Sequence, residues 1–405
     1  MNDLMNLLKS LGVKVDKATN IHPKYVKGIS IDKLIPGEWL ESRGERVFQY
    51  RIFYPFGSQH GTVTLANENY FKNQSEFWGI DEIKTFELNN FLFLDMETSG
   101  LSSGAGSLAF MFGGCYFSAK GLEVTQLFLD DPTSETLFLS LIDKLIADHN
   151  CLVSYNGKSF DIPVLRTRMV LNYMNSEKLN RNHLDLLHFS RMVWKMRLES
   201  RRLSDIEKEI LAFKRNEEEV PGWIVPQLYQ DYLLTGNALP MKGVFYHNGK
   251  DVVSLAALFL HLSKAISTLE SISTMDRQDI LSIGRIYQKK GNVEMSEKTY
   301  KLGLNRFDIG NVEVKVLRNF ANLLKKQSKW SEAIKCWESA ANQNDTNSCI
   351  ELSKYYEHQV KNFNLALYWA EEAIKINRDS FSSEGSSDLI RRRKRIIGKI
   401  QLNDT

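Results

Sequence analysis

The stretch FLFLDMETSGL, Phe91 to Leu101, restricts the possible folds of this chain more than any other. Its four leading apolar residues predict a short strand inside a packed core. Because strand side chains alternate between faces, Asp95 and Glu97 project from one face and Met96 from the other. Two adjacent carboxylates beside an apolar core repel each other unless a cation lies between them, and oxygen ligands favour magnesium or manganese. The alternative is an acidic pair that ends an exposed edge strand.

The segment that follows predicts an α/β domain. Three strand-like runs come first, then a helix, a fourth strand and a second helix, so a crossover helix joins three neighbouring strands to a further strand. These elements are expected at residues 91–94, 108–117, 122–129, 136–148, 151–154 and 160–173.

Two further polar groups follow in the chain. In SYNGKSFD, Asn156 and the next glycine form a turn after the fourth strand, and Asp161 lies in the first turn of the next helix. In YHNGKDVVSL, His247 and Asp251 are four residues apart and share one helical face. Each group has a simpler interpretation: Asp161 as a helix-start residue that complements the helix dipole, and His247 as a surface histidine.

The three groups, in this order, resemble the three exonuclease motifs of the DnaQ-like superfamily. The matching subtype is DEDDh, which has four carboxylates and a histidine. More narrowly, DMETSGL, YNGKSFD, HLDLLHFSRMVW and HNGKDVVSL resemble the bacterial YprB family. The resemblance covers residues 86 to 265 and extends to about 375. It implies a ribonuclease H-like fold with a mixed five-stranded sheet, followed by an all-α tetratricopeptide-repeat domain. Ser99 replaces the threonine of many relatives and keeps its hydroxyl.

The resemblance also implies a chemistry. Two Mg²⁺ or Mn²⁺ ions would be held by the four carboxylates, and the histidine, with an ordinary pKa near 6.5, would take the proton from the attacking water. Asp185 and Arg191 have two equal interpretations. They contact phosphate or support the site residues, or they form a structural ion pair. The implied catalytic residues are Asp95, Glu97, Asp161, His247 and Asp251, of which the four carboxylates are also metal ligands. The implied substrate-binding residues are Thr98, Leu101, Asn156, Lys158 and Arg191.

Three regions are expected: a lead segment at 1–85 with a β-hairpin, the ribonuclease H-like domain at 86–268, and a tetratricopeptide-like domain at 275–400. The hairpin is expected within 47–65, where His60 is a substrate contact or, as favoured here, a turn histidine without a role. Ser296, Ala333 and Ala366 are spaced 37 and 33 residues apart, close to the repeat period of about 34. The alternative is an unrelated helical bundle. The basic run at 391–395 is a capping helix or a phosphate contact.

The chain has 52 basic and 49 acidic residues, so its overall charge is nearly balanced. Any surface that binds nucleic acid must therefore be a local cluster of basic residues. Four scattered cysteines without a CxxC spacing argue against a zinc knuckle or a disulfide framework, and favour reduced thiols in the cytoplasm. No apolar stretch approaches the roughly 20 residues of a membrane span. Candidate phosphate contacts near the motifs are Lys158, Arg166, Arg168, Lys195, Arg197, Arg201 and Arg202.

The predicted function is a metal-dependent 3′–5′ exonuclease, with DNA favoured over RNA and a role in DNA repair. One alternative is a structure-selective endonuclease of the same fold. Another is an inactive scaffold in which only the repeats function, although an unused site has no reason to keep four acidic residues together. The repeats imply a protein partner, for example a helicase.

Overall fold

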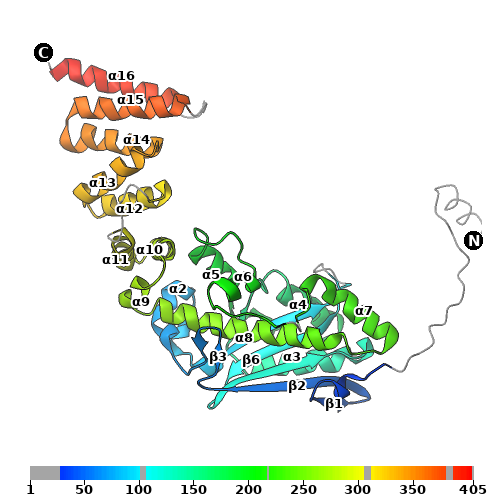
Figure 1. Cartoon of the computed structure of the whole chain (residues 1–405). Coiled ribbons are helices and arrows are strands. Elements are labelled where there is room, and N and C mark those ends of the chain that lie inside the picture. Colours follow the sequence, from blue (N-terminus) through cyan, green and yellow to red (C-terminus); the bar gives the residue numbers. More distant parts are fainter. Residues whose placement is uncertain (1–27, 101–105, 217–218, 305–311, 380–385, 404–405) are drawn as a thin grey trace, which may run out of the picture.

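The computed structural model describes residues 28–100, 106–216, 219–304, 312–379 and 386–403 (Figure 1). Its centre is a seven-stranded mixed sheet. β5, β8 and β9 run parallel to one another, and every other pair of neighbouring strands in this sheet is antiparallel. In spatial order the strands are β1 (Glu38–Ser42), β2 (Glu45–Pro55), β7 (Gly121–Phe128), β6 (Ala109–Phe117), β5 (Phe91–Thr98), β8 (Cys151–Ser154) and β9 (Asn182–Asp185).

The expectation of five strands is wrong, because the N-terminal segment adds two. β1 and β2 form a hairpin through Arg43 and Gly44, and β2 continues along β7, from Phe48 opposite Phe128 to Pro55 opposite Gly121. The described part of the expected lead segment is therefore built into the domain's sheet. The hairpin expected within 47–65 is smaller than predicted. After Pro55 the chain forms a two-stranded hairpin of β3 (Gln59–His60) and β4 (Val63–Thr64).

Strand β5 divides the apolar interior into two cores. Phe91 and Phe93 pack in one core, while Leu92, Leu94 and Met96 pack in the other. This alternation is the one predicted for the strand. Asp95 and Glu97 therefore continue the face of Phe91 and Phe93.

Helices cover both faces of the sheet. The long helix α8 (Met241–Ala265) lies across β5, β6 and β7 and crosses in front of the sheet in Figure 1. Its second half packs in the core of Phe91 and Phe93. Its first turns pack in the other core with α3 (Glu135–Ala147), α4 (Asp161–Leu171) and α7 (Val225–Thr235).

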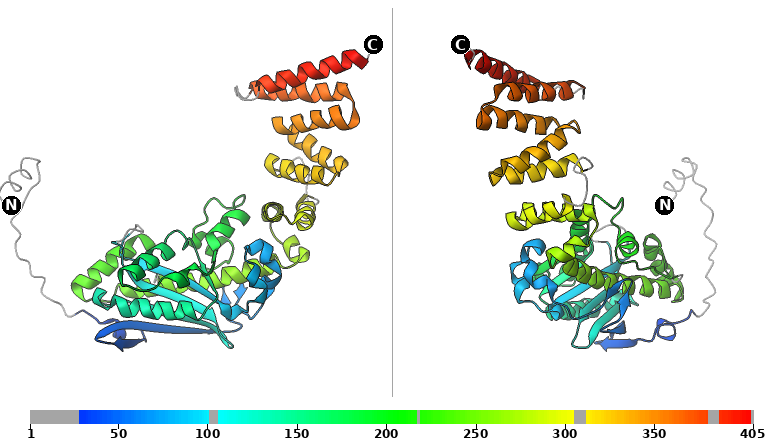
Figure 2. Two further views of the ribbon diagram at one scale, coloured as in Figure 1. Left: turned by 180° about the vertical axis from the view of Figure 1, so that it is seen from behind. Right: turned by 60° about the vertical axis from the view of Figure 1, so that its left-hand side comes forward.

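The C-terminal helices extend away from this domain as a stack (Figures 1 and 2). α10 packs with α11, α12 with α13, and α14 with α15. Ser296, Ala333 and Ala366 are each the fourth residue of the second helix in a pair, and all three are fully buried. The helices are α10 (Arg277–Lys290), α11 (Val293–Leu304), α12 (Val314–Lys326), α13 (Trp330–Ala341), α14 (Thr346–Tyr355), α15 (Phe363–Asp379) and α16 (Ser386–Asn403).

The last helix, α16, uses its cations to cover a buried acid. Glu357 is only 2% exposed, and its carboxylate lies 3.2 Å from Arg392, 2.7 Å from Arg395 and 2.8 Å from Lys399. Arg393 binds Glu371 at 2.8 Å. The basic run at 391–395 was expected to form the outer face of a capping helix, but Arg392 and Arg395 instead face inward onto Glu357. No helix in the described part of the chain combines the length and apolar character that a membrane span needs.

Candidate active site

Asp95 and Glu97 stand where the apolar part of β5 ends, and both are strongly affected by their surroundings. Burial, followed by repulsion from Asp251, Glu97 and Asp161, raises the pKa of Asp95 well above its usual value. Burial also raises the pKa of Glu97 to about 8, against the attraction of His247. Burial is the larger cause for both groups, and the carboxylates of the same cluster add to it in a medium that screens charge poorly.

A buried amide holds Asp95 from the helix side. The Asn248 side chain donates to the backbone oxygen of Asp95 at 3.2 Å and to its carboxylate at 3.1 Å. Gln126 on β7 donates to the Asn248 oxygen at 3.0 Å. Gly113 is the partner of Asp95 on β6, and a Cβ there would come within 2.4 Å of the Asn248 side chain. A glycine is therefore required for α8 to reach Asp95.

Asp161 is brought beside β5 by the loop after β8. It is the first residue of α4, and the backbone N–H of Met96 donates to its carboxylate. Burial raises its pKa to about 7, against these backbone hydrogen bonds. Gly157 makes the approach possible, because a Cβ there would lie 2.8 Å from the Asp161 carboxylate.

Asp185 fixes the same loop. Its carboxylate accepts the backbone N–H groups of Asn156 at 2.8 Å, Lys158 at 3.2 Å and Leu187 at 3.1 Å. It thus caps α5 (Leu186–Val193) and holds the left-handed turn at Asn156, whose φ is +69°. Asp185 has this structural role and forms no ion pair with Arg191 among the described contacts.

His247 and Asp251 face the two β5 carboxylates from α8. Nε2 of His247 lies 3.8 Å from Glu97 and 3.6 Å from Asp251. Its Nδ1 lies 2.7 Å from Glu219, which fixes the orientation of the ring. The shared helical face predicted for His247 and Asp251 is confirmed by this geometry.

The pKa of His247 differs from the near-neutral value expected from its sequence. Burial lowers this pKa, but the hydrogen bond to Glu219 and the charges of Asp251 and Glu97 outweigh burial and raise it to about 9. The imidazole is therefore protonated at neutral pH when no cation neutralises the carboxylates. The expected value was wrong because it ignored the charge of the neighbouring Asp251 and of two acids, Glu97 and Glu219, that come from other parts of the chain.

Arg215 was not identified from the sequence, yet it connects most of the acids on this side of the site. It contacts Glu207 and Glu219, each at 2.7 Å, and also Asp251. Its position two residues before a run of glutamates, in a segment without clear periodicity, gave no local signal of this role. Glu207 comes from α6 (Leu203–Glu209) and is 1% exposed.

The Arg215 network continues to His60, which corrects the expectation of a turn histidine without a role. His60 is buried, its Nε2 lies 2.8 Å from the Ser254 hydroxyl, and its ring stacks on Phe213 at 3.9 Å. Ser254 in turn hydrogen-bonds Glu207. Burial, followed by the charges of Lys250 and Arg215, lowers the pKa of His60 to about 3.

The donor set has the chemistry of a divalent-cation site. Asp95, Glu97, Asp161 and Asp251 supply hard oxygen ligands, and the pKa values of the first three are raised although His247 and Arg215 partly offset the charge of Glu97. Asp251 already forms an ion pair with Arg215. Among the described residues, no three acidic, histidine or cysteine side chains already surround one point as metal ligands do. Binding a cation therefore requires side-chain adjustment, with Asp251 released from Arg215.

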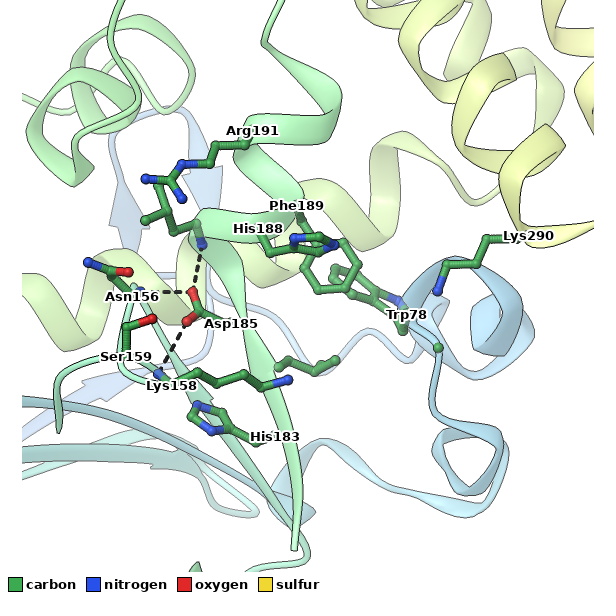
Figure 3. Close-up of a pocket in the computed structure, with 13 residues that line it drawn as sticks. Trp78, Asn156, Lys158, Ser159, His183, Asp185, His188, Phe189, Arg191 and Lys290 are labelled. Carbon is green, nitrogen blue, oxygen red and sulfur yellow. Dashed lines mark hydrogen bonds between the residues drawn. The ribbon is translucent and has the colours of Figure 1, made fainter. Parts of the chain in front are cut away.

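The expected substrate contacts lie in three places. Thr98 ends β5, and its hydroxyl donates to the Gly100 carbonyl at 2.7 Å. Asn156, Lys158 and Arg191 all line one cleft beside the second motif (Figure 3). Leu101 lies outside the described residues.

Comparisons with known proteins agree with this architecture. Residues 92–263 match the family model of the RNase H superfamily. Over 336 residues the chain is 31% identical to YprB of Bacillus subtilis (strain 168), which covers 80% of this chain and 79% of YprB.

Solved structures that resemble the chain in part include two DNA-processing enzymes. The family B DNA polymerase of Pyrobaculum calidifontis is 18% identical with a TM-score of 0.35, over 52% of this chain and 29% of the polymerase. E. coli exonuclease I in complex with a dT13 oligonucleotide is 18% identical with a TM-score of 0.27, over 46% of this chain and 45% of the exonuclease. The chain spans less than half the length of each.

Proposed function

The chain belongs to the protein family of YprB, and from this premise we propose that it is a divalent-metal-dependent nuclease that acts as a 3′–5′ exonuclease. The supporting fold is the ribonuclease H-like domain. The observation that carries the proposal is the concentration of acids from three separate elements, β5, α4 and α8, in one poorly screened site. A stable fold has no use for such repulsion unless a cation relieves it.

The chain's own residues supply orientation and proton transfer. Asp95, Glu97, Asp161 and Asp251 would hold two Mg²⁺ or Mn²⁺ ions, and bound ions of this kind activate water and stabilise charge on a transferring phosphoryl group. Asn248 fixes Asp95, and the Met96 N–H fixes Asp161.

His247 has the position of a general base. Glu219 holds its Nδ1, so Nε2 faces the carboxylates and can accept a proton from water there. Once Glu97 and Asp251 are neutralised, they no longer raise its pKa, which then falls towards the range of a base that works at neutral pH.

An exposed aromatic residue beside the site supports a nucleic-acid substrate. Gly222 lies against His247, and a Cβ built there would be 3.7 Å from Nε2. The next residue, Trp223, is 75% exposed. On the other side, Phe160 directly precedes Asp161 and is 49% exposed. Exposed rings of this kind are suited to stacking on bases.

The test is a digestion panel of end-labelled DNA and RNA with Mg²⁺, Mn²⁺ or chelator. We expect stepwise release of nucleotides from the 3′ end that requires a cation, with DNA favoured. Asp95→Ala should abolish this release and His247→Ala should reduce it strongly. Full activity in both variants would refute the site. Cleavage of a circular strand would instead indicate a structure-selective endonuclease, and inactivity under every condition would favour the scaffold alternative.

Other parts of the proposal concern the rest of the chain. The paired helices after residue 275 are proposed to be tetratricopeptide repeats that bind a protein partner, for example a helicase in DNA repair. A cytoplasmic location is proposed because all four cysteines are buried free thiols.

A further inference from the structure

We propose that a strip of six cations at the junction of the ribonuclease H-like domain and the helical stack binds the phosphates of a nucleic-acid strand that leads to the active site. This strip, which we call the junction strip, combines residues from both parts of the chain. Its members are Lys158, Arg191, Lys195, Arg285, Lys289 and Lys290. The inference rests on the proposed nuclease function and specifies how a long substrate would be held.

Two adjoining cavities define the path of the strip. The first, of about 430 Å³, begins at the loop of Asn156 and Lys158, three residues before Asp161, and extends to Lys290. The second, of about 250 Å³, is lined by Lys195, Arg285 and Lys289. His188 and Arg191 line both, so the two cavities adjoin at these residues.

Figure 3 shows how the cations enter the first cavity. Lys158 extends into it from the strand side, and Lys290 reaches in from α10 beside Trp78. His188 projects from α5 between them, and Arg191 extends from α5 on the side of Asn156, away from Lys290. Cations therefore approach the cavity from opposite walls, as a chain of phosphates running between the walls would require.

The charges of the junction strip are free to bind a ligand. Within the described ranges, none of the six cations forms an ion pair with an acidic side chain. The one acid in these cavities, Asp185, is already satisfied by three backbone N–H groups. Desolvated acids therefore do not compete with a phosphate there.

Other cations that the sequence marked as candidates are used structurally. Arg168 binds Glu135 at 2.5 Å, and Arg197 binds Asp279 at 2.8 Å. Arg201 donates to the carbonyls of Leu198 and Glu199. Arg166 donates to Asn180 at 2.9 Å. Of the basic residues in these runs, Lys158 and Lys195 line the two cavities, and α10 adds three further cations.

The two walls are held at a fixed separation, so the strip has a defined shape. Ile283, Ile286 and Tyr287 of α10 pack in the same core as Trp78 and Phe189 of the nuclease domain. The Arg197–Asp279 ion pair ties the start of α10 to the segment after α5. Preorganised cations lose less entropy on binding than cations on a mobile arm.

The occupant that fits is a phosphodiester strand rather than an acidic polypeptide. The strip starts at the loop that positions Asp161, and a strand whose 3′ end is being hydrolysed must leave the active site along some surface. DNA and RNA share this backbone chemistry. Phosphate contacts of lysine and arginine make binding strongly dependent on salt.

The test compares wild type with the variant Arg285→Gln/Lys289→Gln/Lys290→Gln in chelator, using a labelled single strand of roughly 20 nucleotides, as DNA and as RNA. We expect the Kd to rise about 10- to 100-fold at low salt, and the slope of log affinity against log salt to fall by about 2. A matched control removes the same charges from exposed positions of α12, α13 and α15, as Lys315→Gln/Lys335→Gln/Arg378→Gln. It should stay within about twofold of wild type.

Two further measurements separate this inference from the proposed function. Hydrolysis of a dinucleotide with Mg²⁺ should be unchanged in the triple variant, because so short a substrate does not reach α10. Loss of long-strand binding with intact dinucleotide hydrolysis supports the junction strip. If wild type hydrolyses nothing, the nuclease proposal fails, while the binding comparison still decides the strip.

Three results would overturn the inference. One is an unchanged Kd in a triple variant whose melting temperature equals that of wild type. A second is an unchanged Kd in Lys195→Glu, which reverses a charge on the opposite wall. The third is competition by polyglutamate as effective as competition by an unlabelled oligonucleotide, which would identify an acidic protein as the occupant.

Discussion

Two buried acidic sites in this chain differ in how their charge is balanced. Glu357 in the helical stack is surrounded by Arg392, Arg395 and Lys399, and Arg395 and Lys399 outweigh the effect of burial and lower its pKa. Asp95 in the nuclease domain receives only an amide, and its pKa is raised well above the usual range. A buried acid with cationic partners stabilises a structure, whereas a cluster of acids without them stores repulsion that a ligand can relieve.

The largest expected difference between the two sites is in activity. Asp95→Asn should lower the rate of nucleotide release on the order of 10³-fold, because a ligand of the proposed cations loses its charge. Glu357→Gln should leave that rate within about twofold, since it lies in another part of the fold. Initial rates on an end-labelled strand measure both. A similar loss in both variants would remove the distinction.

The two sites should also respond to pH with opposite signs. The folded-state pKa values of Glu97 and Asp161, about 8 and about 7, lie above their unfolded values. In chelator their contribution to stability is therefore present at low pH and is lost as the pH rises from about 4 to 8. Glu357, with a lowered pKa, contributes stability above its unfolded pKa and loses it on acidification.

Urea unfolding at a series of pH values measures this difference. The Glu97→Gln variant should show a weaker decline in stability between pH 5 and 8 than wild type does, and Glu357→Gln should show the same decline as wild type. A decline that is equal in wild type and Glu97→Gln would mean that the acids of the nuclease site do not repel one another in the folded protein.

Cation binding should stabilise only the unbalanced site. At a Mn²⁺ concentration of about 100 times the Kd, the free energy of unfolding should rise by about 2.7 kcal/mol. The rise should persist in Glu357→Gln and be largely lost in Asp95→Asn, and chelator should reverse it. Denaturation with and without Mn²⁺ gives the result without reference to activity. An equal rise in Asp95→Asn would place the bound cation elsewhere.

The smallest expected effect is the stability cost at the balanced site. Glu357→Gln should lower the free energy of unfolding by about 2 kcal/mol, because it leaves the partly exposed Arg392 and Arg395 without their acid. Asp95→Asn should be neutral or stabilising in chelator, since it removes a repelling charge. Destabilisation by Asp95→Asn as large as that by Glu357→Gln would show that both acids are structural.

Much of the site was accessible from sequence because its signals are local. Strand alternation separated Asp95 and Glu97 from Met96, and the four-residue spacing placed His247 and Asp251 on one face of α8. The Asn-Gly turn before Asp161 could also be recognised. Each of these depends only on residues within one element.

Arg215, Glu219 and Asn248 were missed for a physical reason. Arg215 and Glu219 lie in a segment without helical or strand periodicity, and the residues of α8 that they contact, His247 and Asp251, are 28 to 36 residues away in the chain. Asn248 faces Asp95 across 153 residues, through space left by Gly113. The junction strip likewise joins cations that no local pattern relates.

The sequence by itself determined the type of the elements that carry the motifs, the face on which their acids stand and the order of the motifs, because backbone geometry repeats every two or 3.6 residues. Tertiary structure alone decided which acids are neutralised, that the pKa of His247 is raised, and which cations remain free for phosphates. Electrostatic interactions depend on distance in space and on burial, and neither is set by separation along the chain.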